Sequence, residues 1–464
     1  MKFDSKKYLI DADSSVKKAL EKMEKNHKGM ILICSSSEEI IGLATDGDIR
    51  RALLSGVTVD DSISLCANKD FVWESIHSPR ENLIKKLESH IKFIPILDDA
   101  KKLKMLVSKD FLPLREEEET FIRARAPVRV SFGGGGSDVT NYFSGNTGAV
   151  INSTISLYSH ATMKIVEDSS IEIHSLDLGE TLYASSLEEA MSNSGSFGLI
   201  LSTLKVINPQ YGFRLYLHSD FPIGSGLGGS ATLAAAILGC FNMLRHDRWN
   251  RHELAEIAYQ AERLHLGVAG GWQDQYATVF GGFNFLEFDK KENIINPIRI
   301  HDEILFELEE SLVLCDTGIS HDSGNIHKDQ KIASDLKSIK KKVKENVELT
   351  YEIKNHLLRG NLGNFGSSLH RAWQIKKSLS KKITNAEINK IYEGAIKNGA
   401  LGGKLLGAGG GGFFIFYVPP FQKHNLIKYL EKINLNVQPF RFEPEGLKTW
   451  TSRFSNISEL FKDL

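Results

Sequence analysis

The segment PIGSGLGGSATLAAA, residues 222–236, constrains the fold more than any other part of the chain. It follows FRLYLHSDFPI, whose apolar residues alternate as in a half-buried strand, and it leads into SATLAAAILGCFNMLRHD, which is typical of a strong helix. A glycine turn between a strand and a helix presents backbone amides and a helix N-terminus to a phosphate group. The segment therefore predicts a phosphate-binding loop.

Two familiar kinds of phosphate loop do not fit this segment. Gly224, Gly226 and Gly229 have the G-x-G-x-x-G spacing of a dinucleotide fold, but RHELAEIAYQAERLHLG, residues 251–267, has a helical period where a second strand is required. A Walker loop needs a lysine before Ser230, and the chain has none there. The sequence therefore predicts a phosphate loop of a different class.

Two further segments are rich in glycine. In RAPVRVSFGGGGSDVTNYF, residues 125–143, an alternating strand over 126–132 runs into four glycines and then a polar cluster, which brings backbone close to a ligand. GGKLLGAGGGGFFIFYV, residues 402–418, predicts a glycine turn followed by a fully buried strand. We expect its glycines to pack backbone against backbone near the other two segments, so a structural role competes with ligand contact there.

Two acidic residues are candidates for chemistry. Five apolar residues share one face of the predicted helix 251–267: Leu254, Ile257, Ala258, Ala261 and Leu264. Glu256 points away from this stripe, whereas Glu262 lies at its edge and needs an arginine or a cation as partner, unless it is a surface residue. Asp274 stands between two glutamines beside Trp272, and the pattern allows either a base or a helix-start residue.

Composition limits the classes of function. A chain of 464 residues predicts two or three domains, and 41% hydrophobic with 25% charged residues is typical of soluble globular proteins. A net charge of -1 gives no electrostatic reason to expect nucleic acid or an anionic membrane as partner. No apolar run approaches the ~20 residues of a membrane helix, and MKFDSKKYLI is not a signal peptide. Four widely spaced cysteines predict reduced, mostly buried thiols in a cytoplasmic protein: Cys34, Cys66, Cys240 and Cys315.

The first 110 or so residues alternate short apolar strands with helices. SSVKKALEKMEKN predicts a capped helix, MILICS a buried strand, and EEIIGLATDGDIRRALLSG a strand, turn and helix. SPRENLIKKLESH, IKFIPILDD and KLKMLVSKDFLP repeat this order, which gives a weak repeat of about 60 residues. The charged run REEEET, residues 115–120, suits a linker or a helix end. We place the domain boundary near residue 118, with domains 1–118 and 119–464.

Three segments in this order, RAPVRVSFGGGGSD, PIGSGLGGSAT and KLLGAGGGGFF, resemble the three motifs of the GHMP family of small-molecule kinases. The likeness covers about residues 121–464. Gly229 stands where the family's phosphate motif, P-x-x-x-G-L-x-S-S-A, has its first serine, which removes a hydroxyl and keeps the amide. The resemblance implies an α+β fold of two lobes, residues 119–300 and 301–464, with ATP and an alcohol acceptor in the cleft between them.

The resemblance also implies roles for individual residues. Asp274 takes the proton from the attacking hydroxyl with Arg129 close to it, and Ser230 and Glu262 bind Mg²⁺. The ATP phosphates are bound by the loop residues Gly224, Ser225, Gly226, Leu227, Gly228, Gly229 and Ser230. The implied substrate contacts are Gly135, Gly136, Ser137, Asp138, Gly409 and Gly410, with Asp138 accepting from a sugar hydroxyl.

The expected acceptor is a sugar phosphate. GGGGSDVTNYF, GGWQDQYA, HRAWQIKKSLS and DTGISHDSG are similar to the branch of the family that phosphorylates heptose 7-phosphates at the anomeric hydroxyl, although His321 stands where an arginine is expected. The cations expected to hold the substrate phosphate are Arg371, Lys376, Lys377 and Lys404. A fucokinase-like sugar 1-kinase, a kinase-like nucleotide-binding regulator without turnover, and an oxidoreductase are the alternatives.

The front of the chain resembles a pair of CBS modules, which implies a small α/β domain that binds an adenine nucleotide or a nucleotide sugar. GLATDGDIRRALL supplies Thr45, Asp46 and Asp48 as expected ligand residues, and IKFIPILDD resembles the matching strand of the second module. That second module offers only Ser108 and Asp110, so we expect one working site. The alternative is a dimerisation domain without a ligand, in a homodimeric protein.

Overall fold

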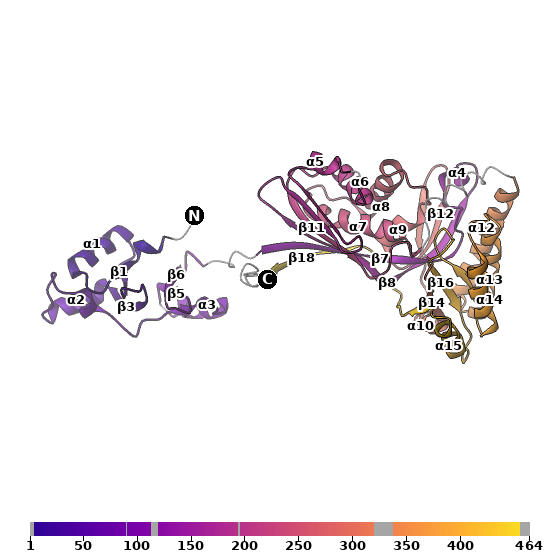
Figure 1. Cartoon of the computed structure of the whole chain (residues 1–464). Coiled ribbons are helices and arrows are strands. Elements are labelled where there is room, and N and C mark those ends of the chain that lie inside the picture. Colours follow the sequence, from indigo (N-terminus) through magenta and orange to yellow (C-terminus); the bar gives the residue numbers. More distant parts are fainter. Residues whose placement is uncertain (1–3, 90, 113–118, 194, 320–336, 455–464) are drawn as a thin grey trace. The chain divides into compact units, whose positions relative to one another are not determined.

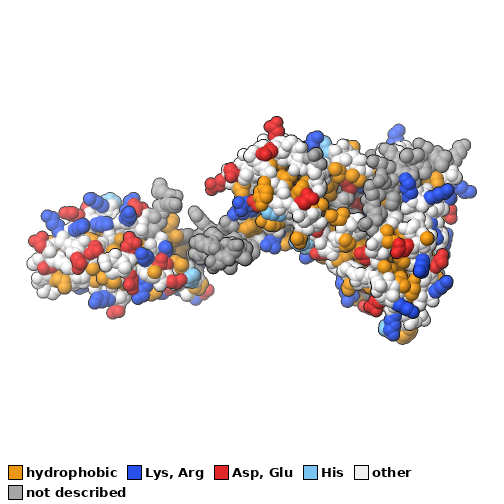
Figure 2. Space-filling model, in the orientation of Figure 1, with side chains coloured by type: hydrophobic (Ala, Val, Ile, Leu, Met, Phe, Trp, Pro, Cys, Tyr) orange, Lys and Arg blue, Asp and Glu red, His pale blue; other side chains and the backbone are white. Residues whose placement is uncertain are grey.

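The computed structural model describes residues 4–89, 91–112, 119–193, 195–319 and 337–454. Contacts divide the chain into two compact units, the first within residues 1–118 and the second formed by Glu119–Phe454. Among the described residues, no helix combines the length and the apolar character needed to cross a bilayer. On the face that Figure 2 shows, basic and acidic side chains are interspersed over both units, as a net charge of -1 leads one to expect.

The first unit contains two three-stranded sheets with the same topology (Figure 1). In each sheet the first strand is parallel to the second, and the second is antiparallel to the third. The strands are β1 (Leu9–Asp11), β2 (Met30–Cys34), β3 (Ile40–Thr45), β4 (Glu74–Ser75), β5 (Phe93–Leu97) and β6 (Leu103–Ser108). The helices are α1 (Val16–Asn26), α2 (Asp46–Leu54) and α3 (Arg80–Glu88), with 3₁₀ turns at Ser5–Lys7 and Ile63–Cys66. The predicted repeat of strands and helices is confirmed.

Local sequence explains the helix starts in this unit. Ser15 caps α1 by accepting from the backbone N–H of Lys18, and α1 packs Val16, Ala19 and Met23 into the core. Thr45 ends β3 and directly caps α2, so strand and helix meet without the turn that the sequence predicts there. The two sheets share a small core in which Leu32 of β2 contacts the same cluster as Leu97 of β5.

The second unit begins with an eight-stranded sheet in the order β10-β9-β11-β8-β12-β13, with β7 beside β8 and β18 beside β7. All pairs are antiparallel except β9 with β11. The strands are β7 (Glu119–Gly133), β8 (Gly148–Ile165), β9 (Ile171–Ser175), β10 (Glu180–Ala184), β11 (Phe213–Ser219), β12 (Phe283–Phe288), β13 (Asn293–Pro297) and β18 (Lys448–Phe454). The predicted strands before the first two glycine segments are thus β7 and β11.

Helices cover one face of this sheet (Figure 1). The helices of this region are α4 (Thr140–Phe143), α5 (Leu187–Met191), α6 (Gly198–Ile207), α7 (Gly229–Asn242), α8 (Arg251–Tyr259) and α9 (Gln273–Phe280). The predicted helix after the phosphate loop is α7, and its alanine-rich middle is fully buried against β7 and β8. Small side chains allow that close approach of helix and sheet.

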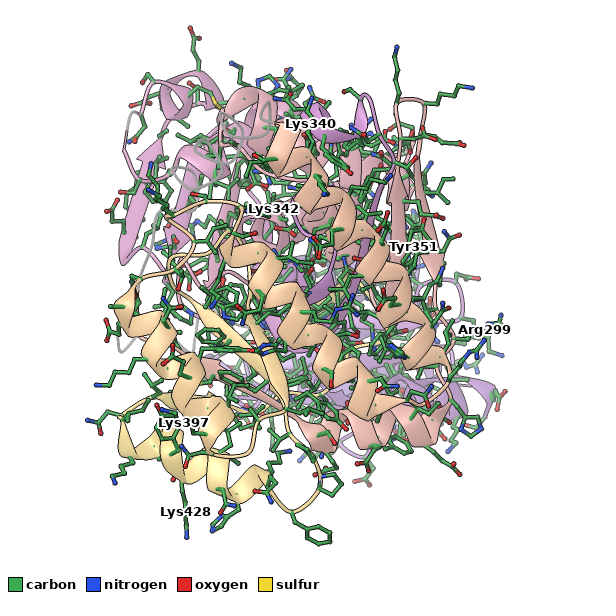
Figure 3. The ribbon with its side chains drawn as sticks, turned by 90° about the vertical axis from the view of Figure 1, so that its right-hand side faces the viewer. Arg299, Lys340, Lys342, Tyr351, Lys397 and Lys428 are labelled. Atoms are coloured by element: carbon green, nitrogen blue, oxygen red, sulfur yellow. The ribbon has the colours of Figure 1, made fainter. Side chains whose placement is uncertain are left out.

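The second unit also contains a four-stranded antiparallel sheet in the order β15-β16-β14-β17. Its strands are β14 (Leu312–Asp316), β15 (Gly402–Leu405), β16 (Phe413–Tyr417) and β17 (Asn436–Gln438). Its helices are α10 (Asp302–Ser311), α12 (Lys337–Leu358), α13 (Leu362–Lys377), α14 (Ala386–Lys397) and α15 (Lys423–Lys432). Figure 3 shows α12, which carries Tyr351, beside α13. The strand β18 returns the chain to the eight-stranded sheet, where it pairs with β7. The division into lobes at residue 300 stays a prediction.

Two segments differ from their prediction. The helix expected over 251–267 ends as an α-helix at Tyr259 and continues as a π-helix, Gln260–His265. A π-turn holds an extra residue, so it rotates the following side chains away from the stripe of an ideal helix. Leu264 is therefore 73% exposed and not part of the apolar stripe. Of the charged run expected as a linker, residues 119 and 120 begin β7, and 115–118 lie outside the described residues.

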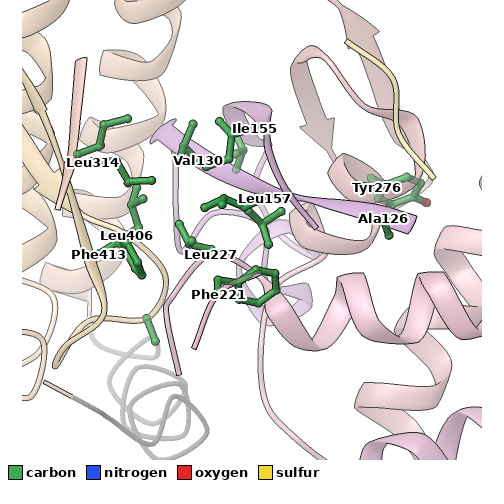
Figure 4. Close-up of a cluster of buried hydrophobic side chains, with 14 of the residues drawn as sticks. Ala126, Val130, Ile155, Leu157, Phe221, Leu227, Tyr276, Leu314, Leu406 and Phe413 are labelled. Carbon is green, nitrogen blue, oxygen red and sulfur yellow. The ribbon is translucent and has the colours of Figure 1, made fainter. Parts of the chain in front are cut away.

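A buried cluster fixes the phosphate loop between the two sheets of this unit (Figure 4). Leu227 is the one large apolar side chain of the loop and is fully buried, in a core that includes Val130 and Leu157 from the first sheet. Leu406 and Phe413, at the ends of the third glycine segment, belong to the same core. Burial of these side chains holds the glycines between them in place.

Candidate active site

The phosphate loop has a backbone that only glycine adopts easily at three positions. Gly224, Gly226 and Gly228 have φ values of +78°, +73° and +85°. The helix α7 begins directly after them, and no side chain caps its first turn. The first N–H groups of a helix have no partner within it and carry the positive end of its dipole. The predicted phosphate-binding geometry is therefore present, with Gly229 and Ser230 in the first turn.

The third glycine segment packs against this loop, as the sequence predicts. The N–H of Phe413 donates to the carbonyl of Ser225 at 3.0 Å. A Cβ on Gly407 would lie 2.6 Å from the Cα of Gly226, and one on Gly412 would lie 2.4 Å from the carbonyl oxygen of Ser225. Side chains at these positions would displace the loop, so these glycines have a packing role.

A cavity of about 360 Å³ opens beside the loop. The loop glycines and Ser230 are part of its lining. Its apolar lining is made by Leu178, Leu199, Ile200, Phe221, Ile223 and Leu233. A cavity that combines a phosphate-binding loop with apolar side chains has the polarity that a nucleoside triphosphate needs. Sequence analysis did not find this lining, and the only signal for it was Phe221 and Ile223 directly before the loop.

Glu262 lies at the edge of this cavity and is 3% exposed. Its carboxylate accepts from the hydroxyl of Ser230 and from Nε2 of Gln275, the latter at 2.6 Å, and forms an ion pair with Arg263 at 2.9 Å. The predicted need for a partner is thus met by Arg263. Sequence analysis gave neither Arg263 nor Gln275 a role, although Gln275 is one of the two glutamines that flank Asp274.

Asp274 lies in the first turn of α9 and borders the same cavity. Both carboxylate oxygens accept from Arg129, from Nε at 2.7 Å and from Nη2 at 2.9 Å. The remaining Nη1 of Arg129 donates to the carbonyl of Gly226 at 2.7 Å. A two-pronged pair with a buried guanidinium fixes the direction of a carboxylate. The predicted closeness of Arg129 and Asp274 is confirmed, and the pair touches the phosphate loop.

A second cavity of about 60 Å³ shares Arg129, Asp274 and Gly407 with the first. Asp138 lines it and is buried, and its carboxylate accepts from the N–H of Gly136 at 3.1 Å and from Nε2 of Gln273 at 3.0 Å. Burial raises the pKa of Asp138, and the nearby charge of Asp274 raises that pKa further. The two cavities therefore meet at the arginine–aspartate pair.

The predicted substrate contacts divide into two groups. Gly135, Gly136 and Asp138 line the second cavity. Ser137 is buried and donates to the carbonyl of Gly134 at 2.7 Å, so it holds the turn. Gly409 and Gly410 pack against Ile383, to whose carbonyl the N–H of Gly410 donates at 2.8 Å. Gly407, to which sequence analysis gave no role, lines both cavities.

Two of the four expected cations reach the second cavity. Lys376 Nζ donates to the carbonyls of Leu405 and Gly407, each at 2.7 Å, and burial and the neighbouring Lys404 lower its pKa well below the usual value. Burial and the charge of Arg129 lower the pKa of Lys404 to about 7.

The other two expected cations lie away from both cavities. Arg371 pairs with Glu352 at 2.6 Å on the surface, and Lys377 lies over the ring of Trp373. His321 lies outside the described residues.

In the first unit, the expected ligand residues are engaged with one another. Asp48 accepts from the N–H and hydroxyl of Thr45, at 2.9 and 2.6 Å, and from Arg51. The N–H of Asp48 donates back to the Thr45 hydroxyl at 3.2 Å, which completes a capping box on α2. The N–H of Asp46 donates to the carbonyl of Gly29 at 3.2 Å. Thr45 and Asp48 thus cap α2, and their role as ligand residues stays a prediction.

The fold and the site together define a phosphotransferase of small molecules. Protein-family models agree with this class. The model of the GHMP kinases N terminal domain matches residues 198–282, and the GHMP kinases C terminal model matches residues 353–432. The CBS domain model matches residues 5–55. The CBS match covers the first of the two repeats, whose topology the second repeat shares. The N-terminal match contains the phosphate loop, Glu262 and Asp274.

Similar proteins identify the family of this chain. D-glycero-alpha-D-manno-heptose 7-phosphate kinase of Campylobacter jejuni subsp. jejuni is 40% identical over 339 residues, which cover 71% of this chain and 98% of that protein. The chain therefore belongs to the GHMP kinase family, whose members use ATP as co-substrate. L-fucokinase/L-fucose-1-P guanylyltransferase of Bacteroides fragilis is 27% identical over 64% of this chain and 34% of its own length. The crystal structure of a D-glycero-D-manno-heptose 1-phosphate kinase from Bacteroides thetaiotaomicron covers 72% of this chain and 100% of its own, with a TM-score of 0.59 and 31% identity.

Proposed function

We propose that this enzyme transfers the γ-phosphoryl group of ATP to the anomeric hydroxyl of D-glycero-D-manno-heptose 7-phosphate and forms the 1,7-bisphosphate. The name of the 40% identical relative supports the sugar. The charge of the second cavity carries the proposal of an anionic acceptor. Arg129, Lys376 and Lys404 face two carboxylates there, and no ion pair or hydrogen bond of the Lys404 ammonium is found among the described residues. Burial disfavours the protonated forms of these lysines, and an anionic ligand beside them favours those forms again, so the cavity suits an anionic acceptor.

Asp274 is our proposed proton acceptor. The acceptor hydroxyl attacks the γ-phosphorus, the bond from that phosphorus to the bridging oxygen of ADP breaks, and the hydroxyl proton passes to the Asp274 carboxylate. Arg129 holds that carboxylate by two hydrogen bonds and places a positive charge beside the developing alkoxide. The loop amides from Gly224 to Ser230 hold the phosphates of ATP. Phosphoryl transfer depends mainly on such positioning and charge neutralisation.

Ser230 and Glu262 are our proposed Mg²⁺ ligands. Their oxygens meet in a hydrogen bond at the edge of the nucleotide cavity, so the two side chains already converge on one point. A hydroxyl and a carboxylate are the oxygen donors that Mg²⁺ prefers, and the ion keeps waters and phosphates as its other ligands. When bound, Mg²⁺ neutralises charge on the phosphates of ATP.

Exchanging Glu262 for Gln raises the Mg²⁺ concentration at half-maximal activity by about tenfold, the loss expected for one charged oxygen contact. The measurement is the initial rate against Mg²⁺ at saturating ATP. Glu256→Gln serves as the matched control, because Glu256 lies on the same helical segment and is exposed. Identical Mg²⁺ curves for Glu262→Gln and the wild type contradict the metal role.

The substrate proposal predicts a strong dependence on the sugar's own phosphate. ATP consumption is measured with heptose 7-phosphate, the same heptose without phosphate, and L-fucose. We expect turnover with the heptose 7-phosphate and a kcat/KM about 10- to 100-fold lower without its phosphate, the range of one or two charged hydrogen bonds. Turnover of L-fucose with none of heptose 7-phosphate overturns the proposal and supports the fucokinase-like alternative.

For the first unit, the CBS match supports our proposal of an adenine nucleotide or nucleotide sugar as ligand. Because Thr45 and Asp48 cap α2, Asp46 is the residue left to contact that ligand. Calorimetry of the full chain with AMP then shows a binding event that Asp46→Ala removes. An unchanged isotherm in this variant contradicts the role of Asp46, and no heat with any nucleotide at millimolar concentration leaves only a dimerisation role for the unit. A cytoplasmic location and a homodimer stay predictions.

A further inference from the structure

Two histidines and an aspartate gather on the face of the eight-stranded sheet that is opposite the helices. His160 of β8 and His218 of β11 are direct partners in the antiparallel register. Asp220 follows His218 by two residues, so its side chain lies on the same side. The alternate residues Ala161 and Leu217 are buried in the core beneath the helices. Figure 1 shows those helices on the other side of β8 and β11.

The ligand atoms of these three residues lie within 4.8 Å of one another. Nε2 of His160 is 3.3 Å from Oδ2 of Asp220, and the two imidazole rings are parallel with centroids 4.4 Å apart. The carboxylate is held in place by the N–H of Tyr158, which donates to Oδ2 at 3.0 Å, while the N–H of Asp220 donates back to the Tyr158 carbonyl at 2.9 Å. The three side chains are therefore arranged before any ligand binds.

The chemistry of the cluster favours a metal ion over a simple hydrogen-bond network. No side-chain hydrogen bond of His218 is found among the described residues. Two cations of this face have other contacts: Arg125 lies over the Tyr158 ring at 4.7 Å, and Arg214 pairs with Glu172 at 2.8 Å.

We propose that His160, His218 and Asp220 bind a divalent transition-metal ion, with Zn²⁺ as its occupant and water as the fourth ligand. Zn²⁺ takes imidazole nitrogen and carboxylate oxygen in a tetrahedral arrangement, whereas Mg²⁺ prefers oxygen ligands alone. The site is therefore separate in chemistry from Ser230 and Glu262. The four cysteines are all buried and do not compete for the ion.

The ion would tie β8 to β11 next to the nucleotide cavity. Ser219, between His218 and Asp220, lines that cavity, and its hydroxyl lies 3.1 Å from the hydroxyl of Ser159. Ser159 in turn lies 2.9 Å from the hydroxyl of Thr232 on α7. The expected effect is on stability, because an ion that binds only the folded chain raises its melting temperature.

The test is calorimetry of the full chain with ZnCl₂ in a buffer that contains Mg²⁺ and no nucleotide. We expect one Zn²⁺ per chain, a higher melting temperature, and with Co²⁺ the visible absorption of a four-coordinate ion. His218→Ala and His160→Gln each weaken the binding by about 100-fold or more, because the loss of even a supporting group costs a metal site about 10- to 100-fold.

His174→Ala is the matched control. His174 lies on the same sheet face, stacks on Tyr216 at 4.3 Å and contacts Glu172, so its loss leaves the Zn²⁺ affinity unchanged. Unaltered kinase activity shows that each variant is folded, because none of these residues belongs to the proposed catalytic machinery. Equal Zn²⁺ affinity in the wild type and both cluster variants, or no Zn²⁺ binding at micromolar concentration, overturns the proposal.

Discussion

Replacing Asp274 by Asn lowers kcat by about 10²–10⁴, the usual loss for a general base, while ATP binding is kept. Asparagine has the same shape and still accepts one hydrogen bond from Arg129, so the phosphate loop keeps its Gly226 contact with that arginine. It cannot take a proton from the acceptor hydroxyl. Single-turnover rates measure the chemical step, and calorimetry with ATP measures the binding.

The control for this prediction is Asp302→Asn, because Asp302 also lies in the first turn of a helix, α10, and is exposed. This variant is expected to keep the wild-type kcat. A single variant Asp274→Asn that keeps more than half of the wild-type kcat contradicts the base role. A wild-type chain that binds ATP and shows no turnover with any sugar supports the regulator alternative.

The parts of the site that depend on local backbone were predictable from sequence. Gly224, Gly226 and Gly228 require positive φ, and the strand before and the helix after them have their own apolar periods. Arg129 and Asp274 were assigned through the family motifs, and the structure brings them together at 2.7 Å. The glycine conformations and the apolar periods depend on short stretches of the chain, so the sequence predicts them without knowledge of the tertiary structure.

Other parts depend on packing between distant elements. Lys376 and Lys377 are neighbours at the end of α13, yet only Lys376 faces β15 and the cavity, because the helix packs on that strand. The π-helix at Gln260–His265 leaves no mark in the apolar period, so Leu264 was placed on the wrong face. Thr45 illustrates a third limit, since a helix cap and a ligand site have the same residue types.

The second large effect is expected at Lys404, whose positive charge is proposed to bind the substrate but lowers the free energy of unfolding. Burial lowers its pKa in the folded chain from 10.5 to about 7. The unfolded chain therefore binds more protons between pH 7 and about 10.5, so this group makes the free energy of unfolding rise with pH across that window. Below pH 7 the folded chain carries the full cost of a buried ammonium. Lys404→Met removes that cost, so the variant melts at a higher temperature at pH 7 and shows a flatter dependence on pH.

The same substitution weakens the enzyme. We expect the KM for the sugar phosphate to rise about 10- to 100-fold at pH 6.5, because a charged hydrogen bond to the phosphate is lost in a site shielded from water. In the wild type this advantage fades as pH rises through about 7, since Lys404 then loses its proton. The KM values of wild type and variant therefore converge toward pH 9.

Lys377→Met is the matched control, because that side chain lies over the ring of Trp373 and lines neither cavity. It is expected to change neither the melting temperature at pH 7 nor the KM. A Lys404→Met enzyme with a wild-type KM at pH 6.5 contradicts the role in phosphate binding, whatever its stability. A buried ammonium destabilises the free enzyme because its charge is desolvated. A bound sugar phosphate supplies the opposite charge that offsets this desolvation cost.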